Sequence, residues 1–250
     1  TDGVDLASGS TIEVGENESV GVFTTGKNQN ISSKATMKIG DGSYGFVIKG
    51  TGTKLTTESP EVTVGNNTVF TYSTDTTGNI INKTKLRSTG SKNYGIYGAG
   101  TITNLADINF ASGIGNVGIY SIGGGTAING NSTEKPIIRV SRSDVENKNY
   151  GIGMAAGYTD DKGVTHQTGT VENYGTIKVE KDNGIGMYAT GSGSMAINRG
   201  DIELSGKNTI GMYLDYGAIG ENYGIIKTVA NATNDGIIGV VAANGAVIKN

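Results

Sequence analysis

A short phrase of sequence recurs about once every 25 residues, and this repeat limits the fold more than any other feature. The phrase Asn-Tyr-Gly-Thr-Ile-Lys-Val at 173–179 returns in altered form at Asn198 and Asn222, and more faintly at Asn82 and Asn104. A second phrase, glycine followed by two mostly apolar residues, alternates with it. Such a period is typical of a solenoid, in which each repeat buries its apolar face by stacking on its neighbour.

The spacing of the two phrases predicts the fold class. The intervals Asn173 to Gly186 and Asn198 to Gly211 are equal, and apolar residues alternate between the marks, as in Ile177-x-Val179. Alternation predicts short strands, and no stretch shows the three- and four-residue periodicity of a helix. We therefore predict an all-β fold with almost no helix, a parallel β-helix of about nine coils. A left-handed hexapeptide helix is the alternative, although coil spacings of 23 to 28 fit multiples of six poorly.

The repeat also predicts which residues point inward. Aliphatic residues on both sides of the repeating glycine should face the core, and the glycines should occupy bends with positive φ. The asparagines should form a turn ladder, because Asn tolerates left-handed backbone and stacked amides hydrogen-bond along the axis. The first aliphatic ladder is Val20, Val117, Ile152, Ile185, Ile210 and Ile238, the second is Val22, Phe46, Ile96, Ile119, Met154, Met187, Met212 and Val240, and the asparagines are Asn82, Asn104, Asn129, Asn173, Asn198 and Asn222.

Composition narrows the function classes. Glycine is 42 of 250 residues and the apolar fraction is 35%, as in flexible low-complexity chains, but regularly placed Ile and Val argue against disorder. There is no cysteine, which excludes a disulfide framework. The net charge of −3 comes with no basic run, so we expect no nucleic-acid partner. No segment approaches the roughly 18 apolar residues of a membrane-spanning helix.

The combination of Asn173-Tyr-Gly-Thr-Ile, Gly184-Ile-Gly-Met-Tyr-Ala and Ala196-Ile-Asn resembles the passenger repeats of large fusobacterial type V autotransporter adhesins. The likeness is best over 147–250. It implies a right-handed β-helix on the cell surface, anchored to the outer membrane by a C-terminal barrel that is absent here. It also implies adhesion to a host-cell surface protein or glycan, or to the surface of another bacterium. We expect 1–250 to be one β-helix segment of a longer passenger, since the repeat is cut at both ends.

Two adjacent coils carry extra residues, which we expect to form loops at 130–148 and 157–169. Asn129 and Gly153 are 24 positions apart instead of 13, and Gly153 and Asn173 are 20 apart instead of 11. Loops on a rigid scaffold commonly carry recognition, although a tolerated insertion with a small hairpin explains them equally. The candidate binding residues are Tyr158, Asp160, Asp161, Lys162 and His166, together with Arg139 and Arg142.

Tyrosines also recur in register. Tyr97, Tyr120, Tyr188 and Tyr213 share one position of the repeat, and we assign Tyr94, Tyr150, Tyr174 and Tyr223 to a second. Stacked tyrosines could form a sugar-binding or self-association stripe, or could merely stack like on like.

Evidence for catalysis is sparse. His166 is the chain's only histidine, and exposed strand positions such as Lys178, Asp201 and Glu203 mix charges without a dense acidic cluster. We therefore expect a non-enzymatic protein without catalytic residues, metal or cofactor. The alternative is a polysaccharide lyase or hydrolase on the same fold, whose acids would line one strand face. The tripeptide Arg199-Gly200-Asp201 matches an integrin motif, but its register with Gly175 explains it as part of a strand.

Overall fold

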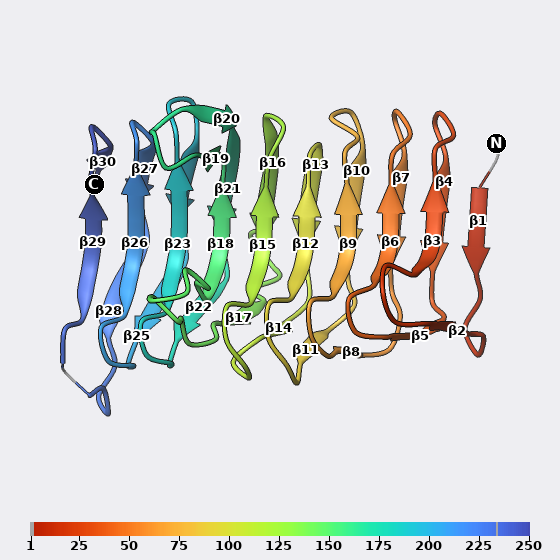
Figure 1. Cartoon of the computed structure of the whole chain (residues 1–250), viewed down its shortest axis with the longest axis horizontal. Coiled ribbons are helices and arrows are strands. Elements are labelled where there is room, and N and C mark those ends of the chain that lie inside the picture. The colour runs from red at the N-terminus through yellow and green to blue at the C-terminus, as the bar shows by residue number, and fades with distance from the viewer. Residues whose placement is uncertain (1–2, 234) are drawn as a thin grey trace.

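The computed structural model describes residues 3–233 and 235–250 as a parallel β-helix of about ten turns (Figure 1). Each turn contributes one strand to each of three faces, and the strands of each face pair in parallel along the axis. Every regular element among the described residues is a strand, so the prediction of an all-β parallel β-helix is confirmed. The β-helix already includes Gly3–Leu6, which forms a strand paired with Asn30–Ser33.

The ten-stranded sheet, called sheet 1, contains β1 (Gly3–Leu6), β4 (Asn30–Ser33), β7 (Lys54–Thr57), β10 (Asn79–Asn82), β13 (Thr101–Asn104), β16 (Gly125–Asn129), β21 (Gly169–Asn173), β24 (Met195–Asn198), β27 (Ile219–Asn222) and β30 (Val247–Lys249). Sheet 2 contains β8 (Val62–Val64), β11 (Leu86–Ser88), β14 (Ile108–Asn109), β17 (Ile137–Arg139), β22 (Thr176–Val179), β25 (Asp201–Leu204) and β28 (Ile225–Thr228). The pair β2 (Thr11–Val14) and β5 (Thr36–Ile39) takes the corresponding place in the first coils.

The nine-stranded sheet, called sheet 3, contains β3 (Val20–Thr24), β6 (Tyr44–Ile48), β9 (Val69–Ser73), β12 (Tyr94–Gly98), β15 (Val117–Ser121), β18 (Ile152–Ala156), β23 (Ile185–Thr190), β26 (Ile210–Asp215) and β29 (Ile238–Ala242). One antiparallel hairpin, β19 (Tyr158–Thr159) with β20 (Thr165–Gln167), stands apart from the three sheets. No helix among the described residues is long and apolar enough to cross a membrane.

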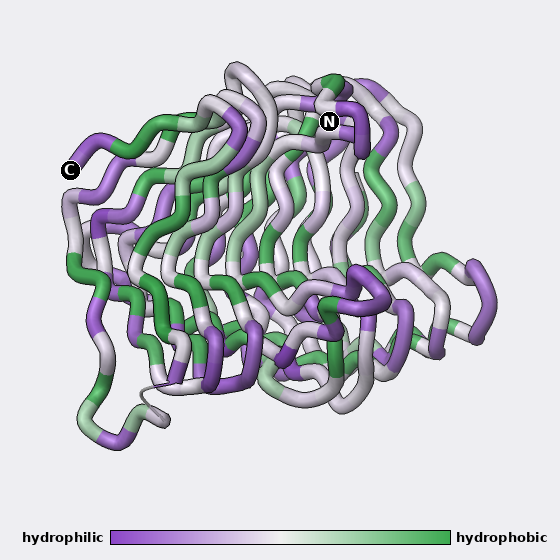
Figure 2. The backbone as a smooth tube through the Cα atoms, turned by 60° about the vertical axis from the view of Figure 1, so that its left-hand side comes forward, coloured by the Kyte–Doolittle hydropathy of each residue, from purple (hydrophilic) through white to green (hydrophobic). Residues whose placement is uncertain are grey.

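The interior is a continuous aliphatic column, and the second predicted ladder lies within it. Figure 2 shows hydrophobic positions recurring at matching levels of successive coils. Of that ladder, Phe46, Ile96, Ile119, Met154, Met187 and Met212 are fully buried, while Val22 and Val240 are partly buried near the ends.

The prediction that the first aliphatic ladder points inward is wrong. Val117, Ile152 and Ile185 form a separate cluster with tyrosines on the outer surface of sheet 3, and Val20 and Ile238 are exposed. The alternation breaks at the repeating glycine, where both strands keep the same register on either side of it. A Cβ atom on Gly118 would meet the core side chain Ile138, and the next residue, Ile119, is also buried, so two successive positions face inward and the residue before the glycine faces outward.

The repeating glycines are required for close approach rather than for positive φ. A Cβ atom on Gly118 would lie 2.6 Å from the carbonyl oxygen of Gly153 and 3.0 Å from Ile138 Cγ2. Positive φ occurs instead shortly before the glycine, at Asn183 (57°) and Asn208 (52°). The asparagines of the turn ladder do not adopt it.

The asparagine ladder itself is confirmed. Each side-chain amide donates to the side-chain oxygen of the next coil at 2.7 to 3.0 Å, from Asn82 through to Asn250. Asn104, Asn129, Asn173 and Asn198 are completely buried, so these bonds satisfy polar groups that would otherwise be unpaired in the core.

Candidate functional site: the tyrosine face

The outer surface of sheet 3 carries a ladder of tyrosines beside the outward-facing aliphatic ladder, and we call this surface the tyrosine face. Tyr72, Tyr97 and Tyr120 pair in register, as do Tyr188 and Tyr213 two coils further on. The prediction that these positions are equivalent is therefore confirmed. The same prediction is wrong for the second set of tyrosines, which do not share one position. Tyr94 pairs with Val117, Tyr150 lies in an insertion, and Tyr174 and Tyr223 each follow an asparagine of the ladder.

The tyrosine rings stack on each other along the axis of the β-helix. Tyr97 and Tyr120 are stacked, with centroids 5.0 Å apart and planes 19° apart, whereas Tyr188 and Tyr213 are 5.8 Å apart and tilted by 37°. Burial raises the pKa of Tyr120 and Tyr188 above that of a free phenol. Both hydroxyls are therefore neutral at physiological pH, and that of Tyr120 donates to the Gly157 carbonyl at 2.8 Å.

The tyrosine ladder is interrupted at one coil. Ala155 pairs with Tyr120 on one side and with Tyr188 on the other, so one ring is missing between two stacks. Ala155 is nevertheless only 2% exposed, because the neighbouring tyrosines pack on the cluster that contains it. A groove of about 240 Å³ lies beside it, and its lining includes Tyr94, Tyr120, Tyr150 and Tyr188 with Lys92 and Lys148.

A second groove continues along the face toward the C-terminal coils. Its volume is about 440 Å³, and its lining includes Ile185, Ile210 and Tyr213, with Asn208 and Asp215 as polar groups. The tyrosine face is thus a row of shallow apolar grooves with a few polar groups, the composition expected of a ligand-binding surface.

Both inserted segments border the tyrosine face. Residues 143–150 form a tight turn closed by Asp144 and Asn149, and its Tyr150 lines both grooves. The other segment forms the β19–β20 hairpin at the upper edge of the β-helix (Figure 1). The two insertions meet through an ion pair of 3.4 Å between Lys148 Nζ and Asp161 Oδ1, both of which are exposed.

Five of the predicted binding residues lie together in the hairpin. The Tyr158 and His166 rings stack at 5.6 Å, and His166 Nε2 lies 2.8 Å from Asp160 Oδ2. The other oxygen of Asp160 accepts from the backbone N–H groups of Lys162 and Val164. The hydrogen bond from His166 lowers the pKa of Asp160. Asp160 therefore shapes the turn, while Lys162 and Asp161 are exposed.

The two predicted arginines lie elsewhere. Arg139 ends β17 within sheet 2 rather than in a loop, and its guanidinium binds both oxygens of Glu180 at 2.7 and 2.8 Å. Arg142 follows β17 and is exposed, and its backbone forms an isolated parallel β-bridge with Ile114. The structure therefore does not bring the seven candidates into one site. The guanidinium of Arg139 is already occupied by its ion pair with Glu180.

Several residues that line the first groove escaped the sequence analysis. Lys92, Lys148 and Ala155 carry no motif, and the tyrosines were considered without their interruption. The available signal was the phrase Gly153-Met-Ala, in which alanine stands where other coils have tyrosine.

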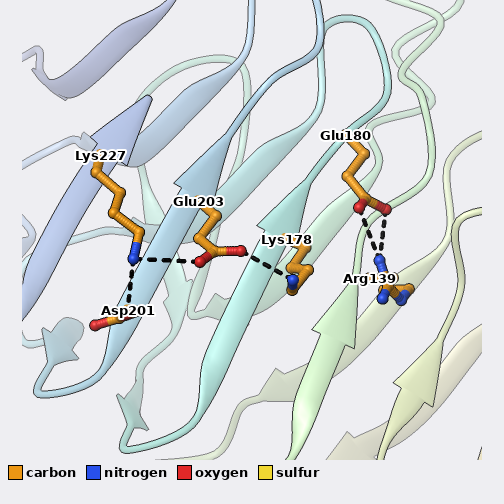
Figure 3. Close-up of polar contacts among 6 residues, drawn as sticks. All are labelled: Arg139, Lys178, Glu180, Asp201, Glu203 and Lys227. Atoms are coloured by element: carbon orange, nitrogen blue, oxygen red, sulfur yellow. Dashed lines mark hydrogen bonds and ion pairs between the residues drawn. The ribbon is translucent and has the colours of Figure 1, made fainter. Parts of the chain in front are cut away.

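Sheet 2 has a contrasting outer face made of charged side chains (Figure 3). Lys178 contacts Glu203 at 3.0 Å, and Lys227 contacts both Glu203 at 3.2 Å and Asp201 at 3.1 Å. The hydrogen bond from Lys178 lowers the pKa of Glu203. Glu203 is therefore ionised at neutral pH and engaged by cations from both neighbouring coils.

Both charged residues of the Arg199-Gly200-Asp201 tripeptide are also held in ion pairs. Arg199 pairs with Glu172 and lies over the Tyr223 ring at 4.7 Å. Asp201 begins β25 and contacts Lys227. Its position in a strand agrees with the interpretation as part of the repeat.

Comparison with protein-family models gives one match, over residues 2–222, to the family described as the BigA third pectate lyase-like domain. BigA is an autotransporter adhesin, so this match confirms the resemblance to passenger repeats. No curated protein and no solved structure matches the chain. Because the family match extends over nearly the whole β-helix, the chain belongs to the BigA third pectate lyase-like domain family.

Proposed function

We propose that this chain is a surface-exposed segment of an autotransporter passenger and that it takes part in adhesion to host cells or other bacteria. The observation that carries the proposal is the family match to a domain of an autotransporter adhesin over residues 2–222. A rigid rod whose turns carry two insertions beside an apolar, tyrosine-rich face supports the same function, because solenoids present extended binding surfaces.

We also propose that the chain is not an enzyme, and the ion pairs of the acidic residues on sheet 2 support this. Glu203 and Glu180 are each held by a cation from a neighbouring coil. The pKa of Glu203 is lowered, chiefly by the hydrogen bond from Lys178, so this carboxyl is poorly suited to be the proton donor that glycoside hydrolysis requires. A polysaccharide lyase or hydrolase is the second candidate, favoured by the pectate lyase-like description of the family. Sustained release of reducing ends or unsaturated uronides by the purified chain would favour that enzyme.

The experiment that tests adhesion is binding of fluorescently labelled chain to host and bacterial cells. A matched variant replaces the hairpin from Tyr158 to Gln167 by a two-residue turn and leaves the coils intact. Saturable binding by the parent chain is expected. Its loss in the variant would place recognition on the hairpin, and its retention would place recognition on the coils. Absence of saturable binding to every cell type would contradict the proposal.

A further inference from the structure

We infer that the larger groove on the tyrosine face binds an extended, basic segment of a partner protein, with Asp215 receiving an arginine or lysine side chain. The groove has a volume of about 440 Å³ and is lined by residues of β18, β23 and β26. This inference names the kind of partner that the proposed adhesion would use, and its biological role rests on that proposal. The exposed apolar rim of the groove, its single charge and its free side-chain amides carry the argument.

The rim of the groove is apolar and exposed. Away from the coils at both ends, the large hydrophobic residues that the described chain exposes all lie in the two insertions: Val145, Tyr150, Tyr158 and Val164. Val145 and Tyr150, which are 53% and 39% exposed, line the groove beside the rings of Tyr188 and Tyr213. A group of exposed apolar and aromatic side chains is typical of the centre of a protein–protein interface.

Asp215 is the only charged residue among the described residues that line the groove. Its Oδ1 accepts hydrogen bonds from the backbone N–H of Tyr216 at 2.9 Å and from Asn244 Nδ2 at 2.7 Å. No lysine or arginine of the described chain forms an ion pair with it, in contrast to Glu203 and Asp201 of sheet 2. The negative charge of Asp215 is therefore not neutralised within the described chain, and an incoming cation would form a charge-assisted hydrogen bond with it.

The ring of Tyr213 lies next to this carboxylate. Tyr213 and Asp215 are two residues apart on β26, so both side chains leave the same side of the strand. Burial, and next the charge of Asp215, raise the pKa of Tyr213, so the carboxylate is within electrostatic reach of the phenol. A cation held by Asp215 can therefore also contact an aromatic face. A carboxylate beside aromatic rings suits a cation on an apolar stem, as in arginine and lysine.

Two side-chain amides on the groove favour a peptide over other organic cations. Asn183 and Asn208 lie one coil apart in the turns that lead into β23 and β26. Their backbone N–H groups donate to carbonyls of the next coil, while their side-chain amides have no hydrogen-bond partner within the described chain. A primary amide offers a donor and an acceptor, which match the C=O and N–H of an extended peptide. A quaternary ammonium headgroup has no N–H to donate in return.

The test is fluorescence polarisation with labelled peptides in which apolar residues alternate with arginine, each with a twin that carries glutamine in place of arginine. We expect the purified chain to bind arginine peptides at least about tenfold more tightly than their twins, because the charge-assisted hydrogen bond exists only for the cation. Added salt should reduce this preference, since Asp215 is only partly buried.

Two variants with the same net charge test the role of Asp215. Asp215→Asn keeps an acceptor for Tyr216 and Asn244 and should remove most of the preference for arginine, while binding of the glutamine twins stays unchanged. Glu61→Gln removes a negative charge from an exposed position next to β8, five coils away from β25 and β26, and should keep the preference.

A second pair of variants tests the apolar rim. Val145→Ser shortens the apolar surface of the groove and should weaken both members of a peptide pair several-fold. Val164→Ser, on the hairpin, changes a side chain that is 52% exposed and does not line the groove, so peptide binding should not change. Circular dichroism and protease resistance show that each variant is folded.

Several outcomes overturn the inference. Equal binding of arginine peptides and their twins, or no saturable binding of any peptide, contradicts a basic partner. A preference for arginine that survives in Asp215→Asn excludes this groove. Binding of phosphatidylcholine vesicles without peptide binding identifies a membrane as the partner, and a dimer that Val145→Ser dissociates identifies a second copy of the chain as the occupant.

Cell adhesion distinguishes this inference from the proposed function. We expect Asp215→Asn to lose adhesion together with its preference for arginine peptides. Adhesion that survives in this variant overturns the role of the groove and leaves the passenger function standing. Selective peptide binding by a parent chain that adheres to no cell contradicts the passenger function and leaves the groove as a peptide site.

Discussion

The outer faces of sheets 2 and 3 belong to the same coils, yet different kinds of side chain lie next to each other along the axis on the two faces. On sheet 2, a cation, an anion and a cation follow one another from coil to coil at Lys178, Glu203 and Lys227, while Arg139, which is in register with Lys178, pairs with Glu180 instead. On sheet 3, like residues lie beside like, as the tyrosines show. These charged side chains satisfy one another through ion pairs. On the aromatic face, the break in the tyrosine row at Ala155 is closed by apolar packing with the rings on either side.

The difference also explains which face we assign to binding. A charge in a self-paired row binds a ligand only by breaking an existing ion pair. The tyrosine face instead borders two shallow grooves of about 240 and 440 Å³, which are lined by tyrosines and aliphatic side chains. Three predictions test this comparison, from the largest expected effect to the smallest.

The largest effect concerns the two sides of sheet 3. Met187→Asp places an unpaired carboxylate in the core and should destabilise the coils by several kcal/mol, because buried unpaired charge is strongly unfavourable. Ile185→Asp lies on the outer side of sheet 3, where Ile185 is 8% exposed, and should cost less, about 1.5 to 3 kcal/mol for the lost apolar burial, because the carboxylate can turn toward solvent. Thermal unfolding and protease resistance measure both. Equal loss in the two variants would contradict the outward placement of Ile185.

A smaller effect is expected from the aromatic face. Tyr188→Ala removes a partly buried ring that packs against Tyr213, and we expect a loss of about 1 to 3 kcal/mol. Tyr188→Phe keeps the ring and should lose less. Denaturant unfolding followed by circular dichroism is the measurement. An unchanged midpoint for Tyr188→Ala would show that the stack contributes nothing to stability.

The smallest effect is expected from the charged face. Glu203→Gln should cost at most about 1 kcal/mol at pH 7, since ion pairs near the surface contribute little. The pKa of Glu203 is lowered in the folded chain, so its contribution is present above the ordinary pKa of 4.5 and is lost as pH falls through the folded value. The melting temperatures of parent and variant should therefore converge on acidification. A difference that grew instead would contradict the assigned pairing.

The sequence repeat was enough to predict several features of the fold. The asparagine ladder and the buried column through Met187 follow from equal residues at equal intervals, because a solenoid places such residues directly above one another. Arg139 was misplaced because a long interval shows that residues were inserted but not where the strand resumes within it. The same limit applies to Lys148, which faces the hairpin only after both insertions have folded.

The sequence by itself determined the coil, its period and the residues that stack. The tertiary structure alone decided which way the residue before each glycine points, since the two-residue alternation breaks at the glycine and the residue after it faces the core. It also decided what covers Ala155. An alanine in one copy of a phrase is an ordinary variation, and only the folded chain places it between Tyr120 and Tyr188, whose packing leaves it 2% exposed.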